Sequence, residues 1–228
     1  MVHQVFDTIA RVYDPMNLVL TLGLWRVWQR RFARVLAVKS GQRALDVACG
    51  TGDLTRMLAE RVGPTGHVVG IDLSERMLEV ARGKLAGAGL GNVTFQPGNA
   101  LALPFADASF DVCTIGFALR NVTDIPATIR EMARVTRPGG RVLSLELSHT
   151  EVPIFRSLFA LYFYHLVPWM GRLVRHGKDP YAWLALSLRS FPPRRELEAI
   201  MREAGLVNVS SIPLTLGVCA IHQGEVPR

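Results

Sequence analysis

Residues 45–53 have the sequence Leu-Asp-Val-Ala-Cys-Gly-Thr-Gly-Asp, and this stretch indicates the fold more clearly than any other part of the chain. Its apolar start predicts a buried strand, and its glycines predict a tight turn that opens a helix. Such a turn lets a ligand approach the backbone closely, and the helix start offers unpaired N–H groups. A Gly-x-Gly pair alone is weak evidence, since a dinucleotide fingerprint has a third glycine where this chain has Thr55. The candidate ligand-binding residues of this stretch are Asp46, Gly50, Thr51 and Gly52.

Two further turns along the chain add candidate ligand-binding residues. Asp72 and Leu73 follow the next apolar run, and Asp72 comes twenty residues after Gly52. A carboxylate at that place accepts hydrogen bonds from both ribose hydroxyls of a nucleoside, which suits NAD and S-adenosylmethionine alike. Asn99 and Ala100 follow a third apolar run, where an amide side chain can pair with an adenine edge or simply form a turn.

From Arg43 onward, short apolar runs alternate with helical segments, which predicts an α/β fold with a Rossmann-like, mainly parallel sheet. The expected strands are Ala44–Ala48, His67–Ile71, Val93–Gln96, Phe110–Gly116 and Arg141–Leu147. The expected helices are Leu54–Val62, Ser74–Ala86 with Ser74 as its N-cap, and Ile125–Thr136, ended by Pro138, Gly139 and Gly140.

Helical patterns flank this alternating region on both sides. Apolar residues at helical spacing between Val5 and Tyr13 predict a helix that Pro15 stops, and a second helix is expected over Val19–Val38. That second helix combines an apolar face with four arginines, which suit a solvated face or an anion or membrane contact. At the other end we expect a helix over Arg194–Ala204 and an antiparallel hairpin of Val207–Ile212 and Leu214–Ile221.

The segment from Glu151 to Gly171 is rich in apolar and aromatic residues. Pro153, Arg156, His165 and Pro168 interrupt it, so its apolar stretch falls short of the ~20 residues that a membrane span needs. The pattern instead predicts an inserted helix that caps an apolar pocket, or a helix at a membrane interface, whose headgroup zone would suit the nearby Arg172 and Arg175.

Composition indicates one soluble globular domain with additions. The chain has 228 residues, of which 49% are hydrophobic and 20% charged, too many charges for a polytopic membrane protein and too many apolar residues for a disordered chain. The net charge of +7 favours anionic partners such as nucleic acid, lipid headgroups or phosphorylated substrates. Three cysteines without metal-ligand spacing, and an N-terminus without the apolar core of a signal peptide, favour a reducing cytoplasm and no metal site.

These motifs together resemble those of the class I S-adenosylmethionine-dependent methyltransferases. The motifs that carry this resemblance are the glycine turn, Asp72, Asn99, Leu103-Pro104-Phe105 and Ser109-Phe110-Asp111. Two signatures are similar to the menaquinone and ubiquinone biosynthesis C-methyltransferases in particular: Tyr13-Asp14-Pro15-Met16-Asn17 and Leu119-Arg120-Asn121-Val122-Thr123-Asp124. Further matches run to the tail of the chain: Arg137-Pro138-Gly139-Gly140-Arg141, Leu145-Glu146-Leu147-Ser148, Ser190-Phe191-Pro192, Ala204-Gly205 and residues 214–222. Ubiquinone-side members often have a serine where this chain has Gly116, so that side-chain contact is absent here.

The resemblance implies a seven-stranded methyltransferase sheet in a single domain over residues 1–228. Within it we expect an N-terminal helical lid over residues 1–40, a cofactor-binding core over 41–150, an apolar helical cap over 151–192, and a C-terminal helix with a hairpin over 193–228. S-Adenosyl-L-methionine is the implied cofactor, with contacts at Thr51, Asp72, Asn99 and Ala100.

The activity that the resemblance implies is C-methylation of the quinol ring of demethylmenaquinol to menaquinol. A ubiquinol precursor or another small phenolic acceptor is the alternative. A quinone carbon is electrophilic, whereas a deprotonated quinol pushes electrons onto its ring carbon, so the site must favour the phenolate. Arg120 and Asn121 follow the fourth strand and could hold and orient its oxygens, while Asp14 or a water held by Arg120 could take the proton. Tyr13 and Asp14 are further candidates on the N-terminal lid, and His165 is a weaker one among packing aromatics.

The expected partner is a polyprenyl quinol, whose tail the apolar segment would shield from water while the protein docks on the inner face of the cell membrane. An RNA methyltransferase is disfavoured because Gly116-Phe117-Ala118-Leu119 stands where an Asn/Asp-Pro-Pro-aromatic sequence would handle a base, so we expect no nucleic-acid partner. A non-catalytic binding module is disfavoured by the intact glycine turn with Asp72, and a nicotinamide dehydrogenase by Thr55. The oligomeric state, including a homo-oligomer, stays open.

Overall fold

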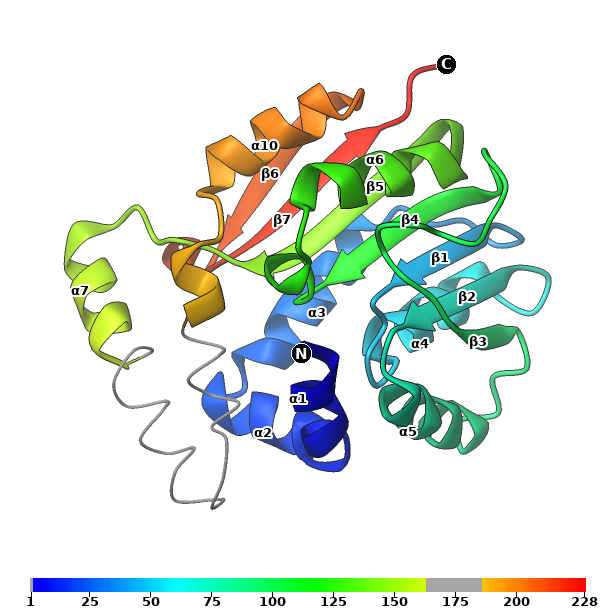
Figure 1. Cartoon of the computed structure of the whole chain (residues 1–228), viewed down its shortest axis with the longest axis horizontal. Helices are drawn as coiled ribbons and strands as arrows, with labels where there is room; N and C mark the ends of the chain where they lie inside the picture. Colours follow the sequence, from blue (N-terminus) through cyan, green and yellow to red (C-terminus); the bar gives the residue numbers. More distant parts are fainter. Residues whose placement is uncertain (1, 163–185) are drawn as a thin grey trace.

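The computed structural model describes residues 2–162 and 186–228, and a seven-stranded sheet forms its centre (Figure 1). The strands lie in the order β3-β2-β1-β4-β5-β7-β6. Of these seven strands, β7 runs against its neighbours β5 and β6, while the other pairs are parallel. The strands are β1 (Arg43–Val47), β2 (His67–Asp72), β3 (Val93–Pro97), β4 (Phe110–Gly116), β5 (Thr136–Leu147), β6 (Val207–Leu214) and β7 (Cys219–Glu225). This arrangement confirms the predicted α/β methyltransferase sheet.

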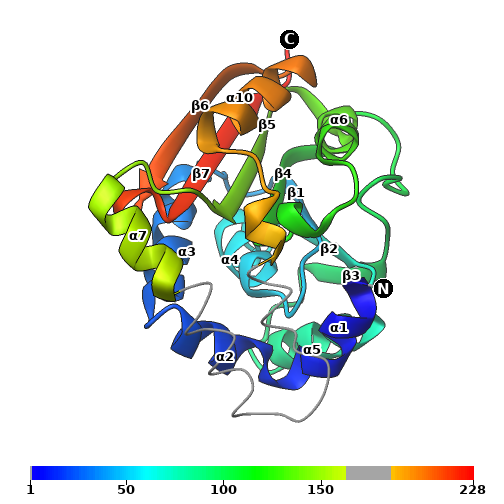
Figure 2. The ribbon, with the colours of Figure 1, turned by 60° about the vertical axis from the view of Figure 1, so that its left-hand side comes forward.

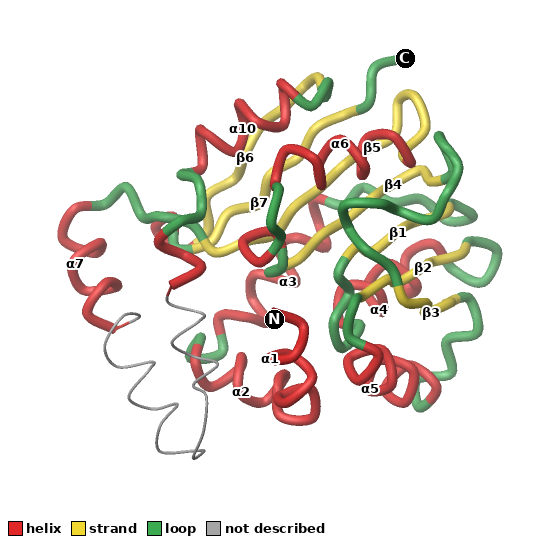
Figure 3. The backbone as a smooth tube through the Cα atoms, in the orientation of Figure 1, coloured by secondary structure: helices red, strands yellow, loops and turns green. Residues whose placement is uncertain are grey.

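Helices cover both faces of the sheet, as Figures 1 and 3 show. Helices α6 (Ile125–Val135) and α10 (Arg194–Glu203) contact each other and β4 to β7. Helices α3 (Leu24–Val35) and α4 (Asp53–Val62) lie behind the sheet in Figure 1, and α5 (Glu75–Ala86) packs on β2 and β3. The chain reverses its direction of sheet growth between β1 and β4, which is where open α/β sheets bind ligands.

Local chemistry explains the boundaries of these central elements. Gly50 and Gly52 both adopt positive φ, at 55° and 81°, which glycine tolerates best and which the turn into α4 requires. Ser74 is the N-cap of α5 as predicted, since its hydroxyl accepts a hydrogen bond from the Met77 N–H. Strand β4 has the predicted bounds, and the bounds of β1 to β3 and α4 to α6 differ from the predictions by one residue.

The N-terminal predictions were wrong in two places. Pro15 does not stop a helix, because it lies in the first turn of α2 (Tyr13–Leu20). Backbone N–H groups in a first turn make no hydrogen bond within the helix, so proline, which lacks this group, is tolerated there. Ahead of it come α1 (Val2–Ile9) and a short 3-10 helix, η1 (Ala10–Val12). The helix expected from Val19 begins only at Leu24, because Leu22 and Gly23 form a turn with φ of 50° and 80°.

Strands β5 and β7 also differ from the predictions. The Pro-Gly-Gly sequence that was expected to follow a helix lies within β5, which starts at Thr136. The hairpin of β6 and β7 is antiparallel as predicted, but the second strand starts at Cys219 because a 3-10 turn, η4 (Thr215–Gly217), joins the two.

The predicted apolar cap is described only in part. Its first portion forms α7 (Pro153–Leu161), which Figure 2 shows at one side of the molecule, and residues 186–189 form a helical turn. Residues 163–185, which include His165, Arg172 and Arg175, lie outside the described residues. Within the part of the chain that the structure describes, no helix combines the length and apolarity needed to cross a membrane.

Glycine at position 140 is required by close packing of β5 against β4. A Cβ there would lie 2.7 Å from the Asp111 carbonyl oxygen and 2.6 Å from Thr136 Cγ2. We therefore expect Gly140→Ala to lower the free energy of unfolding by about 1–3 kcal/mol, measured by denaturant titration. Gly83→Ala is the control, because Gly83 lies within α5 with nothing within 4 Å of its Cβ position, and it should stabilise by about 0.5–1 kcal/mol. Equal effects of the two substitutions would contradict close packing at position 140.

Candidate active site

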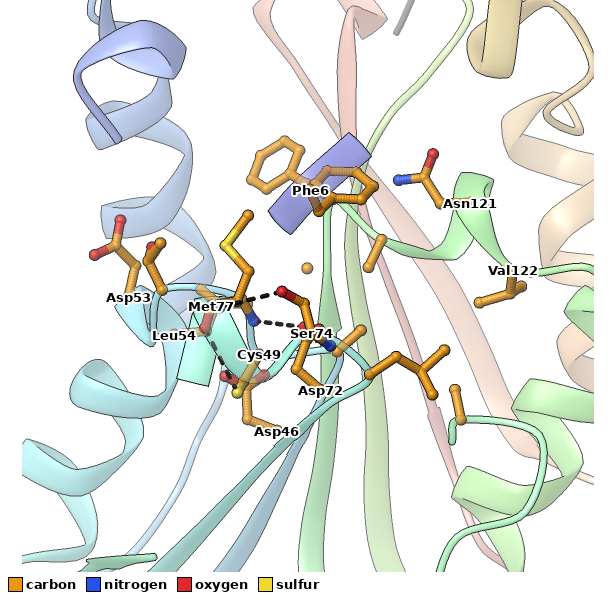
Figure 4. Close-up of a pocket in the computed structure, with 18 of the residues that line it drawn as sticks. Phe6, Asp46, Cys49, Asp53, Leu54, Asp72, Ser74, Met77, Asn121 and Val122 are labelled. Carbon is orange, nitrogen blue, oxygen red and sulfur yellow. Dashed lines mark hydrogen bonds between the residues drawn. The ribbon is translucent and has the colours of Figure 1, made fainter. Parts of the chain in front are cut away.

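A cavity of about 430 Å³ lies where β1, β2 and β4 end. Figure 4 shows Asp46, Cys49 and Asp72 along one side of it and Phe6 and Asn121 across from them. Its lining comes from three parts of the chain: the N-terminal helices, the turns after β1, β2 and β3, and the segment that follows β4. The lining includes Phe6, Tyr13, Trp25, Gln29, Asp46, Gly50, Thr51, Asp53, Leu54, Asp72, Leu73, Asn99, Ala100, Phe117 and Asn121.

The carboxylate of Asp72 joins two of these turns. Its Oδ2 accepts a hydrogen bond of 2.9 Å from the N–H of Gly50, and its Oδ1 accepts one of 2.8 Å from the N–H of Ser74. Burial raises the pKa of Asp72, while these backbone donors act in the opposite direction. Each carboxylate oxygen keeps a second lone pair, so Asp72 can still accept bonds from a pair of ribose hydroxyls.

The residues near the turn after β3 indicate a particular ligand less clearly than Asp72 does. The side chain of Asn99 accepts a hydrogen bond of 3.0 Å from the Leu101 N–H, so its oxygen serves the turn and its amide nitrogen is left to donate. Leu73 is 61% exposed and lines the cavity, where it offers an apolar surface to a flat ring. Seven of the eight predicted cofactor residues thus line the cavity, and the exception, Gly52, instead packs toward Ala81, Leu85 and Phe95.

Asp46 is a fully buried carboxyl group on the floor of the cavity. It accepts hydrogen bonds from the hydroxyls of Thr55, at 2.6 Å, and Thr114, at 2.9 Å. Burial raises the pKa of Asp46 to about 7, and the nearby charge of Asp72 adds to that rise. Neither Asp46 nor Asp72 forms an ion pair with any residue in the described ranges. Two carboxyl groups without a cation beside them fit a positively charged nucleoside ligand such as S-adenosylmethionine.

A polar network fastens the N-terminal helices to the glycine turn. Asp14 accepts hydrogen bonds from the Thr51 hydroxyl at 2.6 Å and from Lys84 Nζ at 2.5 Å, and Lys84 also pairs with Asp53 at 2.5 Å. A second link joins Asp7 to the Ser74 hydroxyl at 2.5 Å. Both oxygens of Asp14 are therefore engaged, and Asp14 does not line the cavity.

Asp53 connects this network to helix α3. Its Oδ2 accepts hydrogen bonds from Gln29, at 3.0 Å, and from the indole of Trp25, at 3.3 Å. Burial acts to raise the pKa of Asp53, but Lys84 and these donors outweigh it and hold the pKa below its ordinary value. Sequence analysis missed Lys84, Asp53 and Gln29, since no spacing in the sequence relates residues 29, 53 and 84 to one another.

Aromatic side chains form a connected wall of the cavity, and its member Phe6 lies across from Asp46 and Asp72 (Figure 4). The rings of Trp25 and Phe117 are stacked with centroids 4.1 Å apart, Tyr13 meets Trp25 edge-on at 6.4 Å, and Phe6 meets Tyr13 edge-on at 6.1 Å. Phe117 adopts a φ of 55° directly after β4, which turns its ring toward the N-terminal helices. This wall is an apolar surface suited to an aromatic ligand.

Two of the four predicted catalytic residues, Tyr13 and Asn121, line the cavity. Burial raises the pKa of Tyr13 to about 12, against the opposing charge of Arg120, so its hydroxyl stays protonated at neutral pH and can donate. Asn121 ends a short 3-10 helix, η2 (Leu119–Asn121), across the cavity from Asp72.

Arg120 is not among the residues that line the cavity, and its predicted catalytic role stays a prediction. Its guanidinium is buried, pairs with the fully buried Glu146 of β5, and donates to the Phe117 carbonyl oxygen at 2.9 Å. Burial raises the pKa of Glu146, and the charge of Arg120 opposes that rise. The ion pair holds the segment from Phe117 to Asn121 in place.

Position 116 also has a structural explanation. A Cβ at Gly116 would overlap Cδ1 of Leu54, which lines the cavity from the first turn of α4. Leu54 therefore occupies the space that a serine side chain at position 116 would need. The candidate His165 lies outside the described residues, among which no group of His, Cys, Asp and Glu side chains could hold a metal ion.

Comparisons with known proteins find relatives over nearly the whole chain. The sequence model of the ubiE/COQ5 methyltransferase family matches residues 1–225. The demethylmenaquinone methyltransferase of Halalkalibacterium halodurans is 45% identical over 98% of this chain and 91% of its own length. The demethylmenaquinone methyltransferase of Staphylococcus aureus (strain JH9) is 46% identical over 98% of this chain and 92% of its own length. A solved S-adenosylmethionine-dependent methyltransferase from Aquifex aeolicus has a TM-score of 0.64 at 20% identity, over 87% of this chain and 89% of that one, and so shows the fold.

The buried carboxyl of Asp46 predicts a pH dependence of stability in the ligand-free protein. Because folding raises the pKa of Asp46 to about 7, its stabilising contribution is complete below the unfolded pKa of about 4 and is lost as the pH rises through 7. Asp46→Asn removes that dependence. The free energy of unfolding of the variant, relative to the original protein, should rise by on the order of 3 kcal/mol between pH ~4 and pH ~8.

Denaturant titrations across this pH range measure the effect. Glu79→Gln serves as the control, because Glu79 is exposed on α5 and its difference from the original protein should stay flat. A flat difference for Asp46→Asn would show that folding does not raise the pKa of Asp46.

Proposed function

The chain belongs to the ubiE/COQ5 methyltransferase family and is an S-adenosylmethionine-dependent methyltransferase of menaquinone biosynthesis. From that premise we propose that it methylates a ring carbon of demethylmenaquinol, the reduced form of its substrate, between the aromatic wall and the glycine turn. The observation that carries this proposal is the two-sided lining of one cavity, with the carboxyl groups of Asp46 and Asp72 on one side and Phe6 and Asn121 across from them.

The carboxyl side suits the methyl donor. When bound, S-adenosylmethionine supplies an electrophilic methyl group from a positively charged sulfonium. We assign the ribose hydroxyls to Asp72, the adenine to Leu73, Asn99 and Ala100, and the remainder of the cofactor to the glycine turn, with Gly50 and Thr51 beside Asp46. The first turn of α4 adds the positive end of a helix dipole, which suits the carboxylate of the cofactor.

The aromatic side suits the quinol. Phe117, Trp25 and Phe6 offer an apolar surface to a bicyclic ring and keep water from the reacting carbon. A quinol becomes nucleophilic at carbon when a hydroxyl proton leaves, because the phenolate oxygen donates electron density to the ring. Methyl transfer would form a carbon–carbon bond as the methyl–sulfur bond of the bound cofactor breaks, with S-adenosylhomocysteine as the leaving group. The ring carbon would then lose its hydrogen as a proton to restore aromaticity.

We assign the stabilisation of the phenolate to Tyr13 and Asn121. The protonated hydroxyl of Tyr13 can donate a hydrogen bond to the oxygen that carries negative charge, and the amide of Asn121 can orient the ring. Arg120 acts as a positioning residue through its pair with Glu146. Asp14, tied to Thr51 and Lys84, fastens the N-terminal helices over the site, which supports a covering role for residues 1–40. Because both oxygens of Asp14 are engaged outside the cavity, we assign uptake of the quinol hydroxyl proton to bulk solvent rather than to Asp14.

The polyprenyl tail of the substrate requires an apolar surface outside the ring site. Exposed apolar side chains support such a route: Leu22 is 77%, Ile154 87% and Leu161 62% exposed. Because such a tail partitions into the bilayer, we propose that the protein contacts the inner face of the cell membrane peripherally.

The experiment that tests this function measures transfer of labelled methyl from S-adenosylmethionine to a short-tailed demethylmenaquinol analogue, with its oxidised quinone as the comparison. We expect product from the quinol only. Tyr13→Phe should lower kcat about 100-fold, because the acceptor oxygen loses a hydrogen-bond donor, and should leave cofactor affinity unchanged.

Tyr162→Phe is the matched control, since it also removes one hydroxyl, which donates to the Leu20 carbonyl oxygen outside the cavity. Its kcat should stay within about threefold of the original value. Equal product from quinone and quinol would refute ring activation, and full activity of Tyr13→Phe would refute the assignment of the phenolate to Tyr13.

A further inference from the structure

Most of the net positive charge of the protein is concentrated near helix α3. Between Pro15 and Leu45 the chain has six basic residues and no acidic one, against a net charge of +7 for all 228 residues. Four of the six are arginines of α3 itself: Arg26, Arg30, Arg31 and Arg34. A region this one-sided in charge attracts anionic partners wherever it is exposed.

The arginines occupy the outer face of α3. Arg26, Arg30 and Arg34 follow one another at four-residue spacing, so they line up along one side of the helix, and all four arginines are exposed. None of the four forms an ion pair with a residue that the structure describes. The inner face holds the buried Trp28 and Phe32. We call Arg26, Arg30 and Arg34 the arginine stripe.

An apolar tip adjoins the stripe where α2 turns into α3. Leu22 is 77% and Val19 54% exposed, and Leu22 precedes Arg26 by four residues. The end of α7 lies beside this turn, because the Tyr162 hydroxyl donates to the Leu20 carbonyl oxygen at 2.8 Å, and its neighbour Leu161 is also exposed. In Figure 2, α2 and α3 lie on the same side of the molecule as α7.

The combination of stripe and tip selects the chemistry of the partner. Arginines in a row complement the phosphates of an anionic surface, whether lipid or nucleic acid. The exposed leucine and valine at the end of the row strengthen binding only if they leave water. A bilayer interface allows this, whereas the phosphate backbone of a nucleic acid does not. Helix α3 also carries Trp25 and Gln29, which line the cavity, so docking through α3 would hold the site near the membrane.

We propose that the arginine stripe and Leu22 form the surface by which the protein docks on a bilayer of anionic lipids. This inference rests on the proposed function, because a quinol with a polyprenyl tail is collected from a membrane. The stripe lies across the phosphate groups, while Leu22 and Val19 enter the headgroup region and α3 keeps its apolar face in the protein core.

Co-sedimentation of the full chain with vesicles tests the surface. The vesicles contain phosphatidylcholine alone or phosphatidylcholine with phosphatidylglycerol, each at low and high salt. The protein should bind the anionic vesicles at low salt and the neutral ones weakly. Replacing Arg26, Arg30 and Arg34 by Gln should weaken binding on the order of 100-fold, because each arginine near an anionic surface contributes separately.

A matched triple variant tests whether binding depends on these arginines in particular or only on the total positive charge of the protein. Replacing Arg76, Arg130 and Arg195 by Gln removes the same charge from exposed positions on α5, α6 and α10 that form no ion pair with a described residue, and binding should stay within about threefold. Leu22→Ser should weaken binding about tenfold with the stripe intact. Equal losses in the two triple variants would overturn the proposal, as would absence of binding to anionic vesicles at low salt.

Two further measurements keep the outcomes distinct. If the stripe bound an RNA duplex more tightly than anionic vesicles at physiological salt, the partner would be nucleic acid and the proposal would be wrong. Methyl transfer to the short-tailed quinol analogue without vesicles should be equal in the original protein and both triple variants. If the original protein and both triple variants all lacked this activity, the proposed function would be contradicted. The vesicle-binding result would then still test the docking surface.

Discussion

One carboxylate fixes the geometry on which the rest of the site depends. Asp72 ends β2 and accepts the N–H groups of Gly50 and Ser74, so it ties the turn after β1 to the start of α5. The glycine turn could otherwise sample many conformations, and this bond pair selects the one that opens toward the cavity. Because both oxygens of Asp72 keep lone pairs, the same group that shapes the turn can receive a ribose.

The second half of the site is assembled onto this turn from distant parts of the chain. Thr51 and Asp53, within and just after the turn, hold Asp14, Lys84, Gln29 and Trp25, which brings the N-terminal helices and α3 over the cavity. The aromatic wall and Tyr13 therefore depend on polar contacts made at the glycine turn. A buried ion pair, Arg120 with Glu146, anchors the opposite segment that carries Phe117 and Asn121. The glycine turn and the aromatic wall are in this way connected by one set of polar contacts.

The sequence was sufficient for the sheet and for most of the residues that line the cavity at the glycine turn, because these features are encoded at short range. Alternating apolar runs predict parallel strands, and the glycine turn with Asp72 is contained in thirty residues. It was insufficient where the outcome depends on tertiary contacts. Nothing local shows that Arg120 turns inward to Glu146, that Lys84 reaches Asp14, or that Pro15 begins a helix instead of ending one. Gln29 and Lys84 belong to no motif, so only the structure shows that they meet Asp53 at the end of the glycine turn.

The two-sided site is tested most directly by a crystal structure of the protein with S-adenosylhomocysteine and a short-tailed naphthoquinol analogue. We expect the ribose hydroxyls on Asp72 and the naphthoquinol ring against Phe117, with one ring oxygen within hydrogen-bond distance of the Tyr13 hydroxyl and the other side facing Asn121. A ribose bound away from Asp72, or a ring bound outside the cavity between the aromatic wall and the glycine turn, would contradict this assignment of the two sides.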